Sequence, residues 1–187
     1  MAQRGSFQAL PCSHRNMRTA ASVGLISDTH GLMRPEALAA LQRSDLIIHA
    51  GDVGAPEIIE QLRGLAPVIA VRGNVDKGVW ASRLPATAVA EAGSALIYVL
   101  HDIAQLDLDP AASGFNVVVS GHSHKPGHTE RNGVMYLNPG SAGPRRFQLP
   151  VTVARLNLRP LPWKIEFIDL FERSVATDFE PLSPGPA

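Results

Sequence analysis

The chain contains only one cysteine, Cys12, among its 187 residues, so it cannot form a disulfide within itself. Lys plus Arg and Asp plus Glu number 17 each, giving a formal charge of zero and no basic field to bind nucleic acid non-specifically. No apolar run approaches the ~20 residues needed to span a bilayer. These absences argue against a disulfide-stabilised secreted domain and a membrane protein. They fit a reducing compartment, and we expect a cytoplasmic protein.

What is present is the composition of one globular domain. The hydrophobic fraction is 45%, and a chain of this length can bury its own core. We expect a single domain over 22–174, with flexible tails over 1–21 and 175–187. The leading segment has arginines but no acidic residue, which is also compatible with an organellar transit peptide. The last eight residues are too rich in proline for helix or central strand.

The first half of the chain alternates short apolar runs with amphipathic segments. This pattern predicts strands at 22–27, 46–49 and 68–71 and helices at 35–41 and 56–65. Such alternation is the mark of a mostly parallel sheet with crossover helices. After Pro85 the pattern changes, and strands are predicted at 86–91, 95–100, 115–120, 134–137, 151–158 and 163–170. Ala92-Gly93-Ser94 is typical of a hairpin turn.

Four short motifs rich in metal-ligating side chains follow predicted strands. They are Asp28-Thr29-His30, Gly51-Asp52, Gly73-Asn74 and Gly121-His122-Ser123-His124, with a lone His101 before the last. Each motif alone is weak, but all four in this order are expected in on the order of one in ten thousand shuffled chains. Ligands bind at the carboxyl ends of strands in such sheets, where these motifs lie. The set therefore predicts one site holding two metal ions.

The spacing within the motifs supports convergence on a common pocket. Residues two apart in an extended chain point to the same side, so Asp28 can converge with His30, and His122 with His124. Asp52 can bridge two cations ~3.5–4 Å apart with its two oxygens. Asn74 offers a neutral oxygen, and His101 a further imidazole. The glycines beside the ligands allow the backbone to turn sharply and approach bound ions closely.

With these ordered motifs the sequence resembles the calcineurin-like metallophosphoesterases, and within them the YfcE-like phosphodiesterases. The resemblance covers roughly 22–171. It implies a fold of two facing mixed β-sheets flanked by helices. It also implies two ligand sets that share Asp52: one metal held by Asp28, His30, Asp52 and His124, the other by Asp52, Asn74, His101 and His122.

The implied activity is hydrolysis of a small-molecule phosphate ester, with a phosphodiester as the preferred substrate class. A hydroxide held between the two cations attacks phosphorus in line, while the ions neutralise charge on the phosphoryl oxygens. Asp52, Asn74 and His122 are the residues expected to take part in catalysis, through that hydroxide and the substrate phosphate. The mixed donors suit Mn²⁺, our preferred candidate, or Fe²⁺, Co²⁺, Ni²⁺ or Zn²⁺. The resembled group often forms dimers or tetramers, so a homo-oligomer is expected.

Two positions depart from the resembled pattern. Many members carry a histidine after the asparagine of Gly-Asn, where it assists the leaving group, but this chain has Val75, as YfcE-like relatives also lack that histidine. We therefore expect a preference for esters whose leaving group needs no proton, such as aryl phosphodiesters. The second departure is His101-Asp102-Ile103, where relatives commonly show His-Gly-His. The role of Asp102 is left open.

Alternatives from other classes remain. One is a phosphomonoesterase, and another is a non-catalytic scaffold, as in a retromer subunit with a similar fold. Eroded ligands would favour the scaffold, and none of the seven is eroded here. His49 is expected to be a satisfied buried histidine, His128 to be exposed, and Asp76 to fix its loop. Arg72, Arg145 and Arg146 are expected at the solvated surface, and Ser141 is a candidate phosphate contact.

Overall fold

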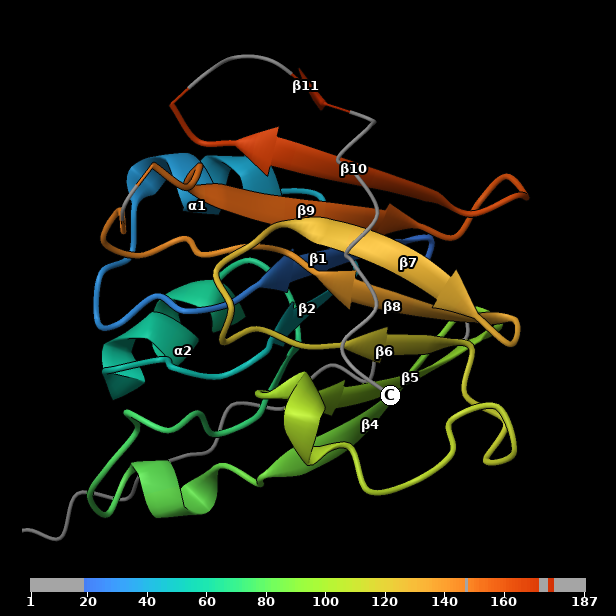
Figure 1. Cartoon of the computed structure of the whole chain (residues 1–187). Helices are drawn as coiled ribbons and strands as arrows, with labels where there is room; N and C mark the ends of the chain where they lie inside the picture. Colours follow the sequence, from blue (N-terminus) through green and yellow to red (C-terminus); the bar gives the residue numbers. More distant parts are fainter. Residues whose placement is uncertain (1–18, 147, 172–174, 177–187) are drawn as a thin grey trace, which may run out of the picture.

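The structure, a computed structural model, describes residues 19–146, 148–171 and 175–176 (Figure 1). Of the tails predicted over 1–21 and 175–187, residues 1–18 and 177–187 lie outside the described residues. Ala20 is 4% exposed and packs in the core, and the backbone N–H of Ala21 donates to the Asp45 carboxylate at 2.9 Å. The packed chain therefore includes residues at the end of the segment that the sequence analysis assigned to the leading tail.

One sheet has six strands in the order β11, β10, β9, β1, β2, β3. Their bounds are β1 Ser22–Ile26, β2 Leu46–His49, β3 Val68–Ala70, β9 Thr152–Asn157, β10 Lys164–Asp169 and β11 Val175–Ala176. β1, β2 and β3 pair in parallel, and β9, β10 and β11 extend the sheet with antiparallel pairs. The sheet therefore combines the predicted parallel strands of the first half of the chain with three strands from its C-terminal part.

The second sheet has five strands in the order β4, β5, β6, β8, β7. Their bounds are β4 Thr87–Ala92, β5 Ala95–Leu100, β6 Val117–Val119, β7 Gly127–Arg131 and β8 Val134–Asn138. β4 and β5 form the predicted hairpin, while β6 lies parallel to both β5 and β8. β7 was not predicted, since its sequence lacks apolar alternation; it pairs with β8 at the edge of the sheet.

The two sheets face each other and bury a shared core. Alternate residues of the central strands contribute to it, including Val23 and Leu25 of β1 and Val117 and Val119 of β6, all 0% exposed. The other side of β1 and β2 packs on the helices α1 (Pro35–Leu41) and α2 (Pro56–Arg63), which lie on the same side of the molecule (Figure 1). Burial on both faces explains why these strands are continuous apolar runs.

The outer face of the five-stranded sheet is covered differently. Leu106, Leu108 and Phe115 pack on it, from the segment that follows the short 3₁₀ helix η3 (Ile103–Gln105). Another 3₁₀ helix, η2, spans Ala81–Arg83. The expectation of two facing mixed sheets flanked by helices is therefore confirmed, with α1 and α2 both on the six-stranded sheet. Within the described residues, none of the helices has the length and apolar character needed to cross a membrane.

Candidate metal centre

The carboxyl ends of five strands meet at one edge of the sandwich, and the predicted ligands follow them. Asp28 follows β1, Asp52 follows β2 and Asn74 follows β3, all in the six-stranded sheet. His101 and His122 follow β5 and β6 in the facing sheet. Because β1, β2 and β3 are parallel, as are β5 and β6, each sheet delivers its ligands to one end. The two sheets thus supply opposite walls of one site.

The backbone at the site is held in a sparsely populated conformation. Seven non-glycine residues have a positive φ in the described part of the chain, and five are predicted ligands: Asp28 (54°), His30 (48°), Asp52 (53°), His122 (65°) and His124 (59°). Such residues cost of order 1–3 kcal/mol each and cluster at functional sites. The ligands do converge, but through left-handed turns and not through the extended chain that the sequence analysis assumed.

Asp52 lies between two imidazoles that come from different sheets. Its Oδ2 atom is 3.9 Å from His30 Nε2 and 3.5 Å from His101 Nε2. Its Oδ1 atom accepts a hydrogen bond from the Val75 N–H at 2.9 Å, which fixes the carboxylate plane. One oxygen, Oδ2, therefore faces both halves of the site, whereas the sequence analysis expected the two oxygens of Asp52 to share the cations.

Asp28, His30 and His124 form the first half. The Nε2 atoms of the two histidines are 3.4 Å apart, and His124 Nε2 is 3.3 Å from Asp28 Oδ1. Asp28 is completely buried, and its Oδ2 accepts hydrogen bonds from the Ser27 hydroxyl and the His122 N–H. Its Oδ1 has no hydrogen-bond partner among the described residues. A buried carboxylate oxygen aimed at two ring nitrogens fits a cation site.

His101, Asn74 and His122 form the second half. Asn74 Oδ1 is 3.0 Å from His101 Nε2 and 3.2 Å from His122 Nδ1. His101 Nδ1 lies 2.8 Å from the Ala50 carbonyl, so it carries the proton that it donates there. The Nε2 lone pair of neutral His101 then faces the acceptor oxygens of Asn74 and Asp52. Three acceptors that meet without a donor need a positive charge between them.

The electrostatics of the protein alone show the same need. Burial lowers the pKa of His101, but hydrogen bonds to Asp52 and to the Ala50 carbonyl outweigh it, and the pKa lies above its ordinary value. Burial likewise raises the pKa of Asp52, and hydrogen bonds from His101 and Val75 more than reverse this, leaving it below the ordinary value. The site therefore favours a negative carboxylate beside a positive charge, which a proton or a metal cation can supply.

In the described part of the chain, two groups of three side chains bring ligand atoms within 4.8 Å of one another: Asp28, His30 and His124, and Asp28, Asp52 and His101. All seven predicted ligands thus lie around one centre. Asn74 and His122 join through the contacts given above, and the His122 side chain is 48% exposed. The residues present fit divalent metal ions by their donors and by their placement.

Supporting residues hold the ligand loops. Asp76 accepts hydrogen bonds from the N–H groups of Val53, Gly54 and Gly73, which confirms its predicted role in fixing its loop. Asn138 donates from Nδ2 to the Gly121 carbonyl at 2.7 Å. It therefore ties the end of β8 to the loop that carries His122 and His124.

The two remaining histidine predictions have different outcomes. His49 is fully buried and satisfied, as predicted: its Nδ1 accepts from the Gly51 N–H at 3.3 Å, and its Nε2 lies 2.9 Å from the Thr29 hydroxyl. Burial lowers its pKa to about 4. The predicted exposure of His128 is wrong, because its ring is half-buried and stacks on Phe167 at a centroid distance of 6.3 Å.

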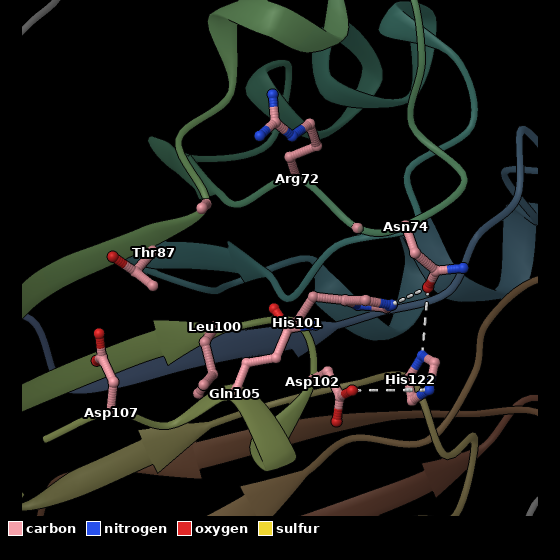
Figure 2. Close-up of a pocket in the computed structure, with 11 residues that line it drawn as sticks. Arg72, Asn74, Thr87, Leu100, His101, Asp102, Gln105, Asp107 and His122 are labelled. Atoms are coloured by element: carbon pink, nitrogen blue, oxygen red, sulfur yellow. Dashed lines mark hydrogen bonds and ion pairs between the residues drawn. The ribbon is translucent and has the colours of Figure 1, made fainter.

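A cavity of about 350 Å³ opens beside the second half of the site, lined in part by Asn74, His101 and His122 (Figure 2). Arg72, Asp102 and Asp107 also line it. The cavity is large enough for an organic substituent next to the candidate ligands.

Arg145 and Arg146 are exposed, as the sequence analysis expected. Arg146 nevertheless reaches the site, with Nη2 3.4 Å from His30 Nε2. Ser141 is not placed for a phosphate contact, since it is 5% exposed and its hydroxyl donates to the Asp28 carbonyl at 3.0 Å. Its hydrogen bond instead holds the backbone of a candidate ligand.

Comparison with known proteins agrees with this geometry. A profile of the calcineurin-like phosphoesterase superfamily domain matches residues 22–160, most of the chain. A probable metallophosphoesterase of Methanothermobacter thermautotrophicus is 36% identical over 148 residues, which make up 72% of this chain and 86% of that protein. The chain belongs to the calcineurin-like phosphoesterase superfamily. It is a metallophosphoesterase by family and by fold, a class of hydrolases that act on phosphate esters and bind divalent metals.

Solved structures show the same fold at lower sequence identity. The Escherichia coli phosphoesterase YfcE superposes with a TM-score of 0.65 at 23% identity, covering 82% of this chain and 96% of that one. Vps29 of Entamoeba histolytica in complex with Zn²⁺ superposes with a TM-score of 0.67 at 24% identity, covering 83% and 96%. These likenesses extend the agreement on fold to nearly the whole length of both relatives.

Proposed function

We propose that the protein is a phosphodiesterase that uses two divalent cations, with Asp52 as the ligand common to both. The observation that carries the proposal is the position of Asp52 Oδ2, 3.9 Å from His30 Nε2 and 3.5 Å from His101 Nε2. Asp28, His30 and His124 would complete one ligand set, and Asn74, His101 and His122 the other. Bound there, two cations would supply an activated water nucleophile and neutralise negative charge on the phosphoryl oxygens.

The protein's own groups hold the site ready for that chemistry. The Ala50 carbonyl orients the His101 ring, and the Val75 N–H orients the Asp52 carboxylate. Strained but hydrogen-bonded turns fix the other ligands, so little reorganisation is needed when substrate binds. Arg146, next to His30, is placed to attract the anionic phosphate to the first half of the site.

Two features support a diester over a monoester. The cavity beside Asn74 and His122 provides room for an ester substituent. Its lining includes two carboxylates, Asp102 and Asp107, against one arginine, Arg72. The extra negative charge of a monoester dianion is disfavoured beside this lining, whereas a diester carries a single charge. The alternative of a phosphomonoesterase predicts the opposite order of activities.

The test is a panel of aryl and alkyl phosphomonoesters and diesters, assayed on metal-stripped protein supplied with one cation at a time. We expect no turnover without metal, restoration by Mn²⁺, and a higher kcat/KM for bis-aryl diesters than for the matching monoesters. Higher kcat/KM for the monoesters would reject the diester assignment. Metal-independent turnover would reject the two-cation mechanism.

A non-catalytic scaffold of the same fold makes a different prediction. Since a Vps29 structure is described as a complex with Zn²⁺, metal binding alone does not separate a scaffold from an enzyme. Turnover does, and a protein that binds two cations but hydrolyses none of the panel would favour the scaffold.

A further inference from the structure

Asp102 directly follows His101 in the chain, and it lines the cavity beside the candidate metal centre. We propose that Asp102 is a positioning residue that orients His122 for the second cation. The inference rests on the proposed function, because it assigns a partner to one of the proposed ligands. Its basis is a series of contacts that runs from His101 through Asn74 and His122 to Asp102 (Figure 2).

The two nitrogens of His122 face different groups. Nδ1 lies 3.2 Å from Asn74 Oδ1, on the side where Asn74 meets His101. Nε2 lies 4.0 Å from Asp102 Oδ2, on the side of the cavity. A cation shared with Asn74 and His101 would therefore take the Nδ1 lone pair. The ring proton must then sit on Nε2, which becomes a donor pointed towards a carboxylate.

His122 needs such a partner more than His101 does. The His101 ring is buried, and its Nδ1 is held by the Ala50 carbonyl at 2.8 Å. His122 has a side chain that is 48% exposed, on a turn with φ of 65°. An imidazole in that setting keeps its rotameric freedom unless its second nitrogen is tethered. Closing the gap to Asp102 by about 1 Å would complete a hydrogen bond of ordinary length.

Asp102 is itself fixed in the required orientation. Its Oδ1 accepts the Ala104 N–H at 3.0 Å and caps η3, so the carboxylate is not free to rotate away. The other oxygen, Oδ2, is left to face His122. A glycine here could supply neither the cap nor the carboxylate. Asp102 thus connects the start of η3 to His122, a proposed ligand of the second cation.

The deciding variant is Asp102→Asn. Asparagine keeps Oδ1 for the cap but presents an amide N–H₂ to the His122 N–H, so that two donors meet. Calorimetric titration with Mn²⁺ should show 10–100-fold weaker binding of the second cation, the range found for lost partners of metal-bound histidine, with the first unchanged. Titration with Co²⁺ should show an altered absorption spectrum for the second site alone. Asp109→Asn is the matched control, because Asp109 caps Ala111 and Ala112 in the same way but does not line the cavity.

The outcomes test the positioning role of Asp102 separately from the proposed function. If wild type binds two cations and Asp102→Asn binds both with wild-type affinity, the positioning role is overturned while the proposed function stands. If wild type binds no cation, the proposed function itself fails. Should Asp102→Asn not fold, Asp102→Glu decides, since its longer side chain spans the 4.0 Å gap to His122. Retained tight binding of the second cation supports the inference, and a tenfold loss overturns it.

Discussion

The carboxylate of Asp52 packs directly against the α-carbon of Gly73. A β-carbon at position 73 would overlap both Asp52 Oδ1 and the Asp52 backbone nitrogen, and would lie 2.8 Å from Asp52 Cγ. Gly73 is not in the left-handed region, so glycine is needed here for space and not for backbone freedom. The loop after β3 can thus approach the proposed bridging carboxylate closely enough to place Asn74 beside His101.

Gly73→Ala should therefore damage stability and the site together. Overpacking of this kind costs about 1–3 kcal/mol, and the displaced Asp52 should weaken binding of both cations. Urea unfolding and Mn²⁺ titration measure the two effects. Gly64→Ala is the control, because its φ is −64° and its nearest contact is the Gln61 carbonyl at 3.1 Å, far from the site. Equal losses of metal affinity in the two variants would contradict the proposed contact.

Asp52→Asn should abolish turnover, because the amide replaces the oxygen proposed to face both cations. Loss of a supporting residue alone costs 10–100-fold in affinity or activity, so removal of a bridging ligand should exceed about 100-fold in kcat/KM. Mn²⁺ titration and diesterase assays measure this. Asp45→Asn is a suitable control, since Asp45 accepts the N–H groups of Ala21 and Ser22 and lies outside the site. It should lower stability and leave kcat/KM unchanged; a fully active Asp52→Asn would remove the bridging role.

How far the sequence predicts the fold depends on which interaction specifies each element. β1 and β2 are buried on both faces, so their apolar runs are visible in the sequence, and β2 is predicted at its observed bounds of Leu46–His49. β7 is specified by its pairing with β8, and its residues are mixed in character, so no local signal marks it. Helix α2 ends at Arg63, two residues before the predicted end, because Gly64 serves as its C-cap.

The candidate site divides in the same way. Ligand-type residues are visible as side-chain chemistry in ordered motifs, and the structure brings all seven together. Their backbone conformation is not visible, since positive φ is uncommon for any non-glycine residue, even for Asp and His, which adopt it more often than most. The supporting roles of Asn138 and Ser141 also depend on contacts between segments distant in the chain, at sequence separations of 17 and 113. Such contacts require the assembled sandwich before they can be recognised.

His49 should make stability fall as pH falls. Its pKa is about 4 in the fold and 6.5 ordinarily, so between these values the unfolded chain binds a proton that the folded protein does not. The stabilisation is present above pH 6.5 and is lost towards pH 4, amounting to about 2–3 kcal/mol between pH 7.5 and 4.5. Urea unfolding gives the free energy of unfolding of metal-stripped wild type and of His49→Gln. The difference between the two proteins should shrink by this amount as the pH falls from 7.5 to 4.5. Parallel pH profiles would refute the assignment.

Val75→His should widen the range of leaving groups. Val75 is 39% exposed, and its N–H donates to Asp52 Oδ1, so its side chain lies at the rim of the site without a proton to offer. In wild type, kcat/KM for diesters should fall steeply as the leaving-group pKa rises. An imidazole at position 75 can protonate the leaving oxygen, which should raise turnover of alkyl diesters by on the order of 10-fold or more and leave activated aryl diesters nearly unchanged.

The matched control is Val79→His, which adds the same imidazole at a residue that is 79% exposed and outside the site. It should leave the leaving-group dependence of wild type intact. A wild-type rate that is insensitive to leaving-group pKa would show that protonation of the leaving oxygen is not limiting, and Val75 would then have no bearing on substrate preference. An increase with Val79→His equal to that with Val75→His would trace the gain to an added surface histidine, because only position 75 adjoins Asn74 and the Asp52 carboxylate.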